Sequence, residues 1–402
     1  MRSSPRTRRA AVLAPLGSAC CALLLSVSCA LACSSPFGAA SGRQALTLMS
    51  YNVLSLFDAV DDGTEYAEFS VARGSWDEVR YRRRLDNLAK VLREGGALSG
   101  SAPDIVCLLE VEKPRVLEDL LAGPLKSAGY RCAAMAPAPG AAINAGLISR
   151  LPIVSLRAHA VSGSSASRSG RYVLEAGFDV EGTPLTMLLC HWKSKLEGAE
   201  PTEDERRQEA ALVEGRVSAL LAADPEAAVV VCGDFNENPD EYLRVGKRYA
   251  TALMPAEEAR SPNAGRLLVA AGLPGSAAGD LSGAARPAGA TSSADASNTE
   301  TAVAGVDTAR APAEPVLYSP WAGAEGFSYA YKGERERIDG FLLSVSLAQG
   351  GRLAYRGFSV LDAPFLLDAS GLPLKWSSFS GSGYSDHLPI LLSIEVAKKA
   401  KE

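Results

Sequence analysis

Apolar residues along this chain fall into short runs that stop abruptly on polar residues. ALTLMSYNVLSLF (45–57), PDIVCLLEVE (103–112) and AAVVVCGDFNENPDE (227–241) have this pattern, which is typical of buried strands that end in loops. Residues 141–154 and 171–195 read as further strands, the second region being a pair joined through a turn at Glu181-Gly182. Strand patterns return at 326–344 and 383–396.

Three stretches between these runs have helical spacing instead. Residues 75–96 end at Gly95-Gly96 and predict an amphipathic helix whose apolar residues are Val79, Leu85, Leu88, Val91 and Leu92. A second helix is predicted from Pro114 to Ala128, and a third within 201–225, where a threonine and acids precede the periodic segment. Helices that alternate with strands and strand pairs indicate a layered α/β domain.

The first 33 residues predict an export signal. Four arginines and no acid precede an uncharged, largely apolar stretch, and the small residues at its end favour a cleaved signal over a transmembrane anchor. Ala-Leu-Ala-Cys ending at Cys33 resembles a bacterial lipoprotein processing site, with Cys29 as the alternative. We therefore expect an exported protein, either secreted or held at a membrane (periplasmic or cell-surface) through an N-terminal lipid.

Length and charge bound the function further. The chain has 402 residues, enough for one large domain or two modest ones. Its formal net charge is −5, and removing the four arginines of the signal brings it to −9. Tight, salt-sensitive nucleic-acid binders usually have a basic face, so this composition argues against that class. It does not exclude an enzyme that holds a phosphodiester briefly through metal ions.

One long segment differs from the rest in composition. Residues 256–317 contain no aromatic residue, and Ala, Gly, Ser, Thr and Pro dominate most of them. Such a sequence cannot bury enough apolar area to offset the entropy of ordering it. We therefore predict a disordered insertion at 276–316 within a single catalytic domain that spans 44–398.

The cysteines beyond the signal lie mostly inside apolar runs. Cys107, Cys190 and Cys232 are expected to behave as small buried hydrophobic residues. A zinc site is not predicted because no C-x-x-C spacing is present. A Cys190–Cys232 disulfide would be possible only if their two strands were neighbours.

Polar side chains capable of binding metal or phosphate stand at the ends of several apolar runs. They are Asn52, Glu110, His191, Asp234, Asn236, Asp339, Asp386 and His387. Each one alone could be a turn residue or a satisfied structural group. As a set they indicate a site, because rigid sheets commonly display functional groups at strand ends and two of the three histidines belong to the set.

The residue types narrow the chemistry of that site. Carboxylates and amides without a cysteine–histidine cluster suit a hard cation that prefers oxygen, such as Mg²⁺ or Mn²⁺. Neither a G-x-S-x-G nucleophile elbow nor a P-loop is present. Hydrolysis of a phosphate ester fits best, with a cation neutralising charge on phosphorus, an imidazole handling protons and an Asp–Asn pair positioning water.

Six segments, in order, resemble the endonuclease/exonuclease/phosphatase superfamily and in particular its secreted bacterial nuclease-like branch. They are MSYNVLSLFD, PDIVCLLEVE, CHWKSK, VCGDFNENPDE, RIDGFLLS and GYSDHLPI, spread over residues 45–397. The resemblance implies a deoxyribonuclease-I-like fold. That fold is a four-layer α/β sandwich in which two mostly antiparallel central sheets are flanked by helices, with the site at one sheet edge.

The resemblance also implies roles for the residues at the strand ends. Glu110 would be the principal metal ligand, aided by Asn52, with Asp386 close to the metal. Asp234 would orient or deprotonate the attacking water, and Asn236 would hold the phosphate.

The two histidines of the set would act on the phosphate itself. His387 would act at the scissile phosphate while Asp339 binds it, orients it and raises its basicity. His191 would be a second imidazole on the phosphate, and the identity of the general base stays open. Lys193 and Asn144 would contact substrate, although Lys193 could equally be a solvated surface lysine.

The chain departs from the superfamily pattern at two places. Leu109 stands where many relatives have glutamine, which would remove one hydrogen bond near the metal-binding glutamate. Leu54 and Ser55 replace the Glu-Asn of a common N-V-E-N-L-F motif. We expect this second change to affect contacts with substrate and to leave the metal site intact.

The predicted function is a divalent-metal-dependent phosphodiester hydrolase, namely a secreted or surface-anchored nuclease whose substrate is nucleic acid. The same residues would also serve a hydrolase of phospholipid headgroups or inositol phosphates. A non-catalytic binding lipoprotein is the alternative from another class, and the complete set of site residues argues against it. No obligate protein partner is evident, and the sequence leaves endo- versus exonucleolytic cleavage open.

Overall fold

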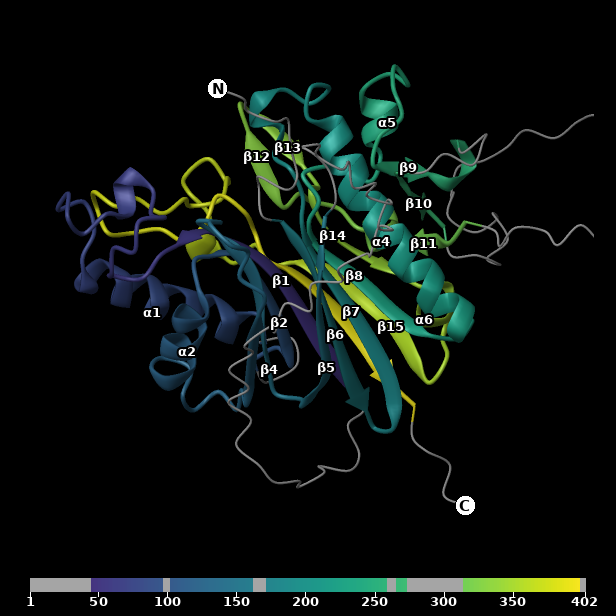
Figure 1. Cartoon of the computed structure of the whole chain (residues 1–402), viewed down its shortest axis with the longest axis horizontal. Coiled ribbons are helices and arrows are strands. Elements are labelled where there is room, and N and C mark those ends of the chain that lie inside the picture. Colours follow the sequence, from purple (N-terminus) through teal and green to yellow (C-terminus); the bar gives the residue numbers. More distant parts are fainter. Residues whose placement is uncertain (1–44, 97–101, 162–170, 259–264, 273–313, 398–402) are drawn as a thin grey trace, which may run out of the picture.

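The computed structural model describes residues 45–96, 102–161, 171–258, 265–272 and 314–397, and within them two large β-sheets pack face to face (Figure 1). The predicted signal at 1–33, with Cys33, lies outside the described residues. So does the predicted insertion at 276–316, except for its last three residues. Of those, Val316 already begins strand β11 (Val316–Tyr318).

The first sheet has six strands. Their order across the sheet is β15 (Leu353–Val360), β16 (Ile390–Val396), β1 (Ala45–Leu56), β2 (Ile105–Val111), β4 (Asn144–Ser149) and β3 (Cys132–Met135). All neighbours run antiparallel except β1 and β2, which are parallel.

The second sheet has eight strands. Their order is β5 (Ile153–Ala160), β6 (Tyr172–Val180), β7 (Thr183–His191), β8 (Ala228–Asp234), β14 (Asp339–Leu343), β11, β10 (Leu267–Ala270) and β9 (Leu253–Pro255). The pair β7–β8 is parallel, as are the two pairs made by β10, and the remaining neighbours are antiparallel.

Alternation along each strand divides its side chains between an inner and an outer core. On β2, Cys107 and Leu109 enter the core between the sheets, whereas Leu108 enters the outer core beneath helices α1 (Glu78–Glu94) and α2 (Pro114–Ala122). Helix α4 (Glu203–Ala223) covers the outer face of the eight-stranded sheet in the same way. The expected four-layer α/β sandwich with mostly antiparallel sheets is therefore confirmed.

Two helix predictions need correction. Val79 is not part of the buried face of α1, because its side chain is 69% exposed. Leu88 comes nine positions after Val79. At about 100° per residue, nine positions amount to two and a half turns, so the two side chains lie on opposite faces of the helix. The second helix ends at Ala122 instead of Ala128, since Gly123-Pro124 interrupts it and proline disfavours a helical residue before it.

The Cys190–Cys232 disulfide is not formed, although β7 and β8 are neighbours. The side chains of the two cysteines lie in cores on opposite faces of the sheet. The Cys232 thiol instead lies 3.6 Å from that of Cys107 on the facing sheet. All four cysteines of the described ranges are buried, and Cys107, Cys190 and Cys232 are not in a disulfide.

Short elements complete the described part of the chain. They are helices α5 (Glu241–Arg244) and α6 (Val345–Gln349) and a separate hairpin of β12 (Tyr329–Tyr331) and β13 (Glu334–Glu336). None of the helices in the described ranges has both the length and the apolar character needed to cross a membrane.

Candidate active site

Strands from both sheets bring the predicted site residues to one edge of the sandwich. In the eight-stranded sheet, Asp234 at the end of β8 is in register with His191 on β7 and with Asp339 on β14. Asn52 and Glu110 reach the same place from β1 and β2 of the six-stranded sheet. Side chains that lie far apart in the sequence are therefore neighbours.

Glu110 points into the site because its strand is irregular there. Its φ is +64°, a left-handed conformation that costs a non-glycine residue about 1 kcal/mol or more. The pairing of β1 with β2 shifts register at this point, and Leu54 and Ser55 opposite also have positive φ. The double bulge re-aims the carboxylate, and the Ser55 backbone N–H and hydroxyl hold its Oε2 at 2.9 and 3.0 Å.

Asn52 lies between two carboxylates. Its Nδ2 donates to Glu110 Oε1 at 3.0 Å and to Asp234 Oδ2 at 3.1 Å. Its Oδ1 accepts from the backbone N–H of Leu54 at 3.0 Å, so in this orientation the amide acts as a donor toward the site. The Ser385 hydroxyl donates to the Asn52 carbonyl at 2.7 Å and thereby connects β1 to the segment that carries His387.

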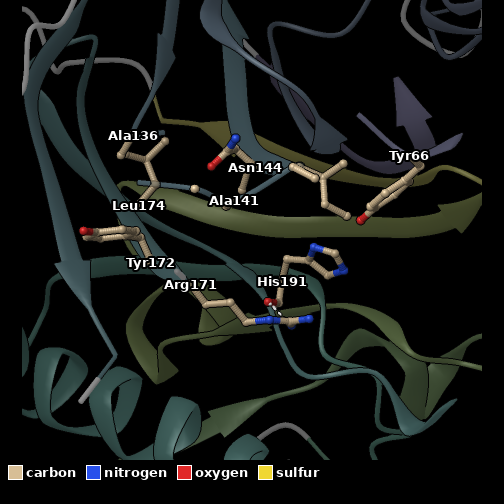
Figure 2. Close-up of a pocket in the computed structure, with 12 residues that line it drawn as sticks. Tyr66, Ala136, Ala141, Asn144, Arg171, Tyr172, Leu174 and His191 are labelled. Carbon is tan, nitrogen blue, oxygen red and sulfur yellow. Dashed lines mark hydrogen bonds between the residues drawn. The ribbon is translucent and has the colours of Figure 1, made fainter. Parts of the chain in front are cut away.

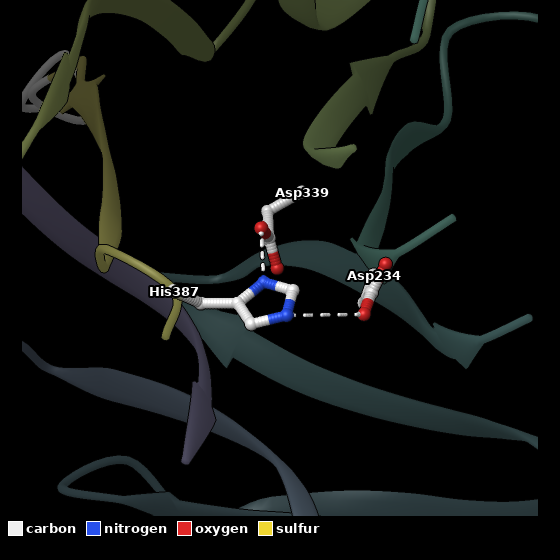
Figure 3. A group of neighbouring side chains, drawn as sticks. All are labelled: Asp234, Asp339 and His387. Atoms are coloured by element: carbon white, nitrogen blue, oxygen red, sulfur yellow. Dashed lines mark hydrogen bonds and ion pairs between the residues drawn. The ribbon is translucent and has the colours of Figure 1, made fainter. Parts of the chain in front are cut away.

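His387 lies between two aspartates, as Figure 3 shows. Its Nδ1 is 2.8 Å from Asp339 Oδ2, and its Nε2 is 3.9 Å from Asp234 Oδ2. Burial lowers the pKa of His387, but the adjacent carboxylates, Asp339 above all, outweigh burial and raise it to about 10. At neutral pH this ring is therefore an imidazolium held by Asp339.

The pKa of Asp234 moves in the direction expected of a buried acid. Burial raises it to about 7 and the negative charge of Asp339 adds to the effect, while His387 and hydrogen bonds from Asn236 and Asn52 oppose it. A carboxyl group that titrates near neutrality is well matched to proton transfer at that pH.

His191 lines a cavity of about 240 Å³ (Figure 2). Its Nε2 is 3.8 Å from Glu110 Oε1 and 3.9 Å from Asp234 Oδ2. Burial, followed by the positive charges of Arg171 and His387, lowers the pKa of His191 well below its usual range. The two imidazoles of the site therefore differ in charge, because His191 is neutral at neutral pH.

Arg171, Tyr66 and Tyr172 also line the cavity. The Arg171 guanidinium donates to the His191 carbonyl at 2.7 Å and lies 3.7 Å from Glu209 on α4. Small residues form much of the remaining wall, in the segment 140–145. The cavity thus offers a cation, two rings and space beside the histidine.

Asn236 belongs to a tight loop after β8. Its backbone N–H donates to Asp234 Oδ1 at 2.8 Å, and its amide donates to the Trp192 carbonyl at 2.9 Å. Gly233 permits this arrangement, because a Cβ there would lie 1.8 Å from the Cys190 carbonyl. The fully buried Arg206 of α4 contacts Glu237 at 2.9 Å and fixes the same loop.

Three other predicted residues have partners of their own. Asp386 Oδ2 pairs with Lys375 Nζ at 3.2 Å, and Lys193 Nζ pairs with Glu197 at 2.9 Å. Asn144 lines the cavity, but its amide accepts from Ala138 N–H and donates to the Glu112 carbonyl. The structure does not join these three residues to the cluster around Asp234.

Sequence reasoning missed several residues that shape the site. Ser55, expected to affect substrate contacts, instead holds the Glu110 carboxylate. Arg171 gave no motif signal, and its place beside His191 follows from pairing between β6 and β7. Tyr329, whose ring centroid lies 4.5 Å from that of His387, belongs to a hairpin whose position the sequence does not reveal.

The donors at this edge fit a hard divalent cation. Glu110 and Asp234 share a single amide donor, and Asp339 Oδ1 is buried without a hydrogen-bond partner among the described residues. Three carboxyl groups thus face the single positive charge of His387, and a cluster of carboxylate oxygens of this kind suits Mg²⁺ or Mn²⁺. Asn52 would present its oxygen to the cation only after its amide turned over.

Comparison with known proteins gives one family and a set of similar structures. The model of the Endonuclease/Exonuclease/phosphatase family matches residues 47–251. No curated protein matches the sequence.

Three solved structures are among those to which this chain is similar. Truncated TDP2 from Caenorhabditis elegans is 14% identical, covers 88% of this chain and 98% of its own, and has a TM-score of 0.47. An endonuclease/exonuclease/phosphatase from Bacteroides vulgatus is 14% identical, covers 88% and 100%, and has a TM-score of 0.46. The human Nocturnin catalytic domain is 15% identical, covers 88% and 95%, and has a TM-score of 0.46.

Proposed function

Since this chain belongs to the endonuclease/exonuclease/phosphatase family, whose model matches just over half of its length, we propose that it is a nuclease. Membership of this family shows that the chain is a divalent-metal-dependent phosphoric ester hydrolase. Our proposal adds that its substrate is nucleic acid. The observation that carries the proposal is the convergence of Glu110, Asp234 and His387 at one sheet edge beside a cavity.

Glu110 would be the principal ligand of Mg²⁺ or Mn²⁺, with Asn52 beside it. The cation would supply positive charge against the phosphoryl oxygens as negative charge develops there. Ser55 keeps the Glu110 carboxylate aimed at this position through two hydrogen bonds. Asp386 would join these residues only after its ion pair with Lys375 opened.

Asp234 would orient the attacking water and accept its proton. Its pKa of about 7 suits that task. At neutral pH a large fraction of Asp234 is deprotonated, and the carboxylate is a stronger base than an ordinary aspartate. Asn236, held against Asp234 by its own backbone N–H, would steady a phosphate oxygen beside the water. Both residues leave the same strand end, so their relative placement is rigid.

The two imidazoles would have different duties because their charges differ. His387, an imidazolium fixed by Asp339, would stabilise negative charge on the phosphoryl group in the transition state. His191, a neutral imidazole, would donate a hydrogen bond to the phosphate or to the departing oxygen. Asp339 would act through His387 by fixing its orientation.

The cavity beside His191 favours a nucleotide over a lipid headgroup. Its volume of about 240 Å³ gives room to the part of the substrate that continues from the scissile phosphate. Arg171 offers a planar cation for phosphate, and Tyr66 and Tyr172 offer rings for a base. A phosphocholine headgroup could also place its ammonium on these rings, but the Arg171 guanidinium beside them would repel that cation, whereas it attracts a phosphate.

The test is cleavage of supercoiled plasmid by protein that begins at Ser34, in Mg²⁺ or Mn²⁺. EDTA and the His387→Ala variant serve as controls. Nicking that depends on metal and is absent from the variant would support the nuclease proposal. Folded protein that leaves plasmid and single-stranded oligonucleotides intact but hydrolyses sphingomyelin or an inositol phosphate would replace nucleic acid with that substrate.

We also propose that the protein is exported and carries a lipid on Cys33, which rests on the sequence of residues 1–33 alone. Mass spectrometry of the N-terminal peptide, after expression in a bacterial host, tests this. A diacylglyceryl-modified Cys33 that disappears in Cys33→Ala but persists in Cys29→Ala is expected. An N-terminal peptide that retains residues 1–33 would contradict the proposal.

A further inference from the structure

The hairpin of β12 and β13 stands apart from both large sheets but is attached directly to His387. Its turn at Lys332 and Gly333 has φ values of +49° and +87°, the combination that suits a two-residue hairpin loop. Tyr329 forms an isolated antiparallel bridge with His387, and the Leu388 N–H donates to the Ser328 carbonyl at 2.7 Å. The hairpin, near the top of Figure 1, is therefore held in a fixed position relative to the site.

Aromatic rings lead outward along this hairpin from the site. The Tyr329 ring lies over His387, with centroids 4.5 Å apart and planes at 30°. Tyr331 shares a face of the strand with Tyr329, and its ring is nearly parallel at 6.4 Å and 11°. The side chain of Tyr331 is 43% exposed, so the row begins at the buried imidazole and ends at solvent.

A positive group accompanies the outer ring. Lys332 Nζ lies 5.0 Å from the centroid of the Tyr331 ring. Arg335, exposed on the opposite strand, pairs with Ala330 and so lies on the other face of the hairpin, over Phe327 at 4.5 Å. On the face of the two tyrosines, Glu336 is paired with Lys195 at 3.5 Å, and the exposed Glu334 lies directly opposite Tyr331. An exposed ring with a flexible lysine beside it is a usual means of gripping single-stranded nucleic acid.

We propose that this hairpin is a base-stacking platform for single-stranded nucleic acid. The nucleobase next to the scissile phosphate stacks on Tyr331, and Lys332 moves onto the phosphate that follows. This inference rests on the proposed nuclease function and adds how the substrate strand is held. The occupant is a nucleic acid for the following reason. The row of rings starts at His387, the imidazole that would act at the phosphate, and a nucleotide carries a planar base linked to that phosphate.

The test compares KM for a single-stranded oligonucleotide among the wild type, Tyr331→Ala and Tyr331→Phe. Loss of the ring is expected to raise KM about tenfold, and phenylalanine is expected to restore it, because stacking needs the ring and not the hydroxyl. Phe379→Ala removes another fully exposed ring, in a loop on the N-terminal part of α1, and is expected to leave KM unchanged. Thermal unfolding checks that each variant is folded.

A second substrate makes the role of the base explicit. With an oligonucleotide that has abasic positions beside the cleavage site, the difference in KM between the wild type and Tyr331→Ala should fall to within about twofold, since no base remains to stack. An undiminished difference on abasic substrate would overturn the proposal. Equal KM values for the wild type and Tyr331→Ala on intact oligonucleotide would overturn it as well.

Failure of the nuclease proposal gives a different result from failure of the stacking proposal. If the wild type hydrolyses bis(p-nitrophenyl) phosphate with Mg²⁺ but cleaves no oligonucleotide, the nucleic-acid substrate is wrong and the platform has no ligand. If the wild type cleaves oligonucleotide and Tyr331→Ala matches it, only the platform is wrong.

Discussion

Among the residues that the structure describes, two acidic groups have the spacing to hold a cation, but their surroundings differ. The inner group is Asp234 and Asp339 with His387, beside Glu110. The outer group is Asp62, Glu65 and Glu112. Both begin near the end of β2, where Glu110 and Glu112 are only two residues apart.

The outer group already contains its cation. Lys113 Nζ lies 3.2 Å from Asp58, 3.0 Å from Asp62 and 3.1 Å from Glu112. Within the described ranges, the inner group has no such lysine. Among the same residues, Glu110 and Asp234 form ion pairs only with histidines, whose Nε2 atoms lie 3.8 to 3.9 Å from the carboxylate oxygens. His191 among them is neutral at neutral pH. The two groups differ in the cation that faces the carboxylates: a lysine ammonium already lies among the outer ones, whereas the His387 imidazolium is held by Asp339 and Glu110 has no ion pair with a lysine or arginine among the described residues. Spacing alone therefore does not define a metal site.

The largest effect is expected where the inner group stabilises the transition state. His387→Ala should lower kcat by about 10²- to 10³-fold, the usual loss when a positioned charge-stabilising group is removed. Steady-state hydrolysis of bis(p-nitrophenyl) phosphate measures this. The control is His159→Ala, because His159 pairs with Glu175 at 2.8 Å away from the site and should not affect kcat. Equal losses in the two variants would remove His387 from the chemistry.

Removing the cation of the outer group should change stability and not catalysis. Lys113→Met leaves the buried Glu112 without its ion pair, which should lower the free energy of unfolding by about 1–3 kcal/mol. The three carboxylates would then resemble an unfilled cation site, so millimolar Ca²⁺ should raise the Tm of the variant more than that of the wild type. Equal shifts in Tm would show that Lys113 does not occupy this position in solution.

Ser55 offers a smaller change at the inner group. Ser55→Ala removes the hydroxyl hydrogen bond to Glu110 but keeps the backbone one, and it should weaken activation by Mg²⁺ about tenfold. The concentration of Mg²⁺ at half-maximal activity measures this. A change in KM for the diester at saturating Mg²⁺, with no change in metal affinity, would instead assign Ser55 to substrate binding.

The last effect concerns the pH dependence of stability. Burial raises the pKa of Glu112 to about 7, so between its ordinary pKa and pH 7 the folded protein binds a proton that the unfolded chain has released. The stability contributed by this group is present at low pH and is lost as pH rises through 7. Glu112→Gln, which cannot titrate, should therefore lose less stability than the wild type between about pH 4.5 and 7.5. Urea unfolding across that range checks it, and parallel curves would contradict it.

Much of the fold follows from patterns that the sequence displays openly. The runs at 45–57 and 227–241 became β1 and β8 because strand burial and strand-end polarity are local signals. The second helix ends at Ala122 because Gly123-Pro124 interrupts it. This is a local signal too, but the helical spacing of the apolar residues continues past it and favoured a longer helix. The contact between Cys232 and Cys107 could not be predicted, because it depends on how one sheet packs on the other.

The site residues also fall into two classes, those that the sequence pattern reveals and those that it does not. The strand-end residues stood out because a polar group that ends an apolar run is visible in one dimension. The double bulge that turns Glu110 inward was not visible, because it depends on three residues with positive φ on two different strands. Tyr329 reaches the site only through pairing with a distant segment, so no spacing in the sequence could identify it. Arg171, by contrast, lies beside His191 because of the register of the hairpin that turns at Glu181-Gly182, which the strand prediction already contained.

The central claim is that the inner carboxylates, and not the outer ones, bind the activating cation. Calorimetric titration of Mn²⁺ into the wild type, Glu110→Gln and Glu112→Gln tests it most directly, because the two substitutions are isosteric and lie on the same strand end. We predict that Glu110→Gln weakens Mn²⁺ binding at least tenfold and that Glu112→Gln leaves it unchanged. Unchanged binding in Glu110→Gln, or an equal loss in Glu112→Gln, would contradict this assignment.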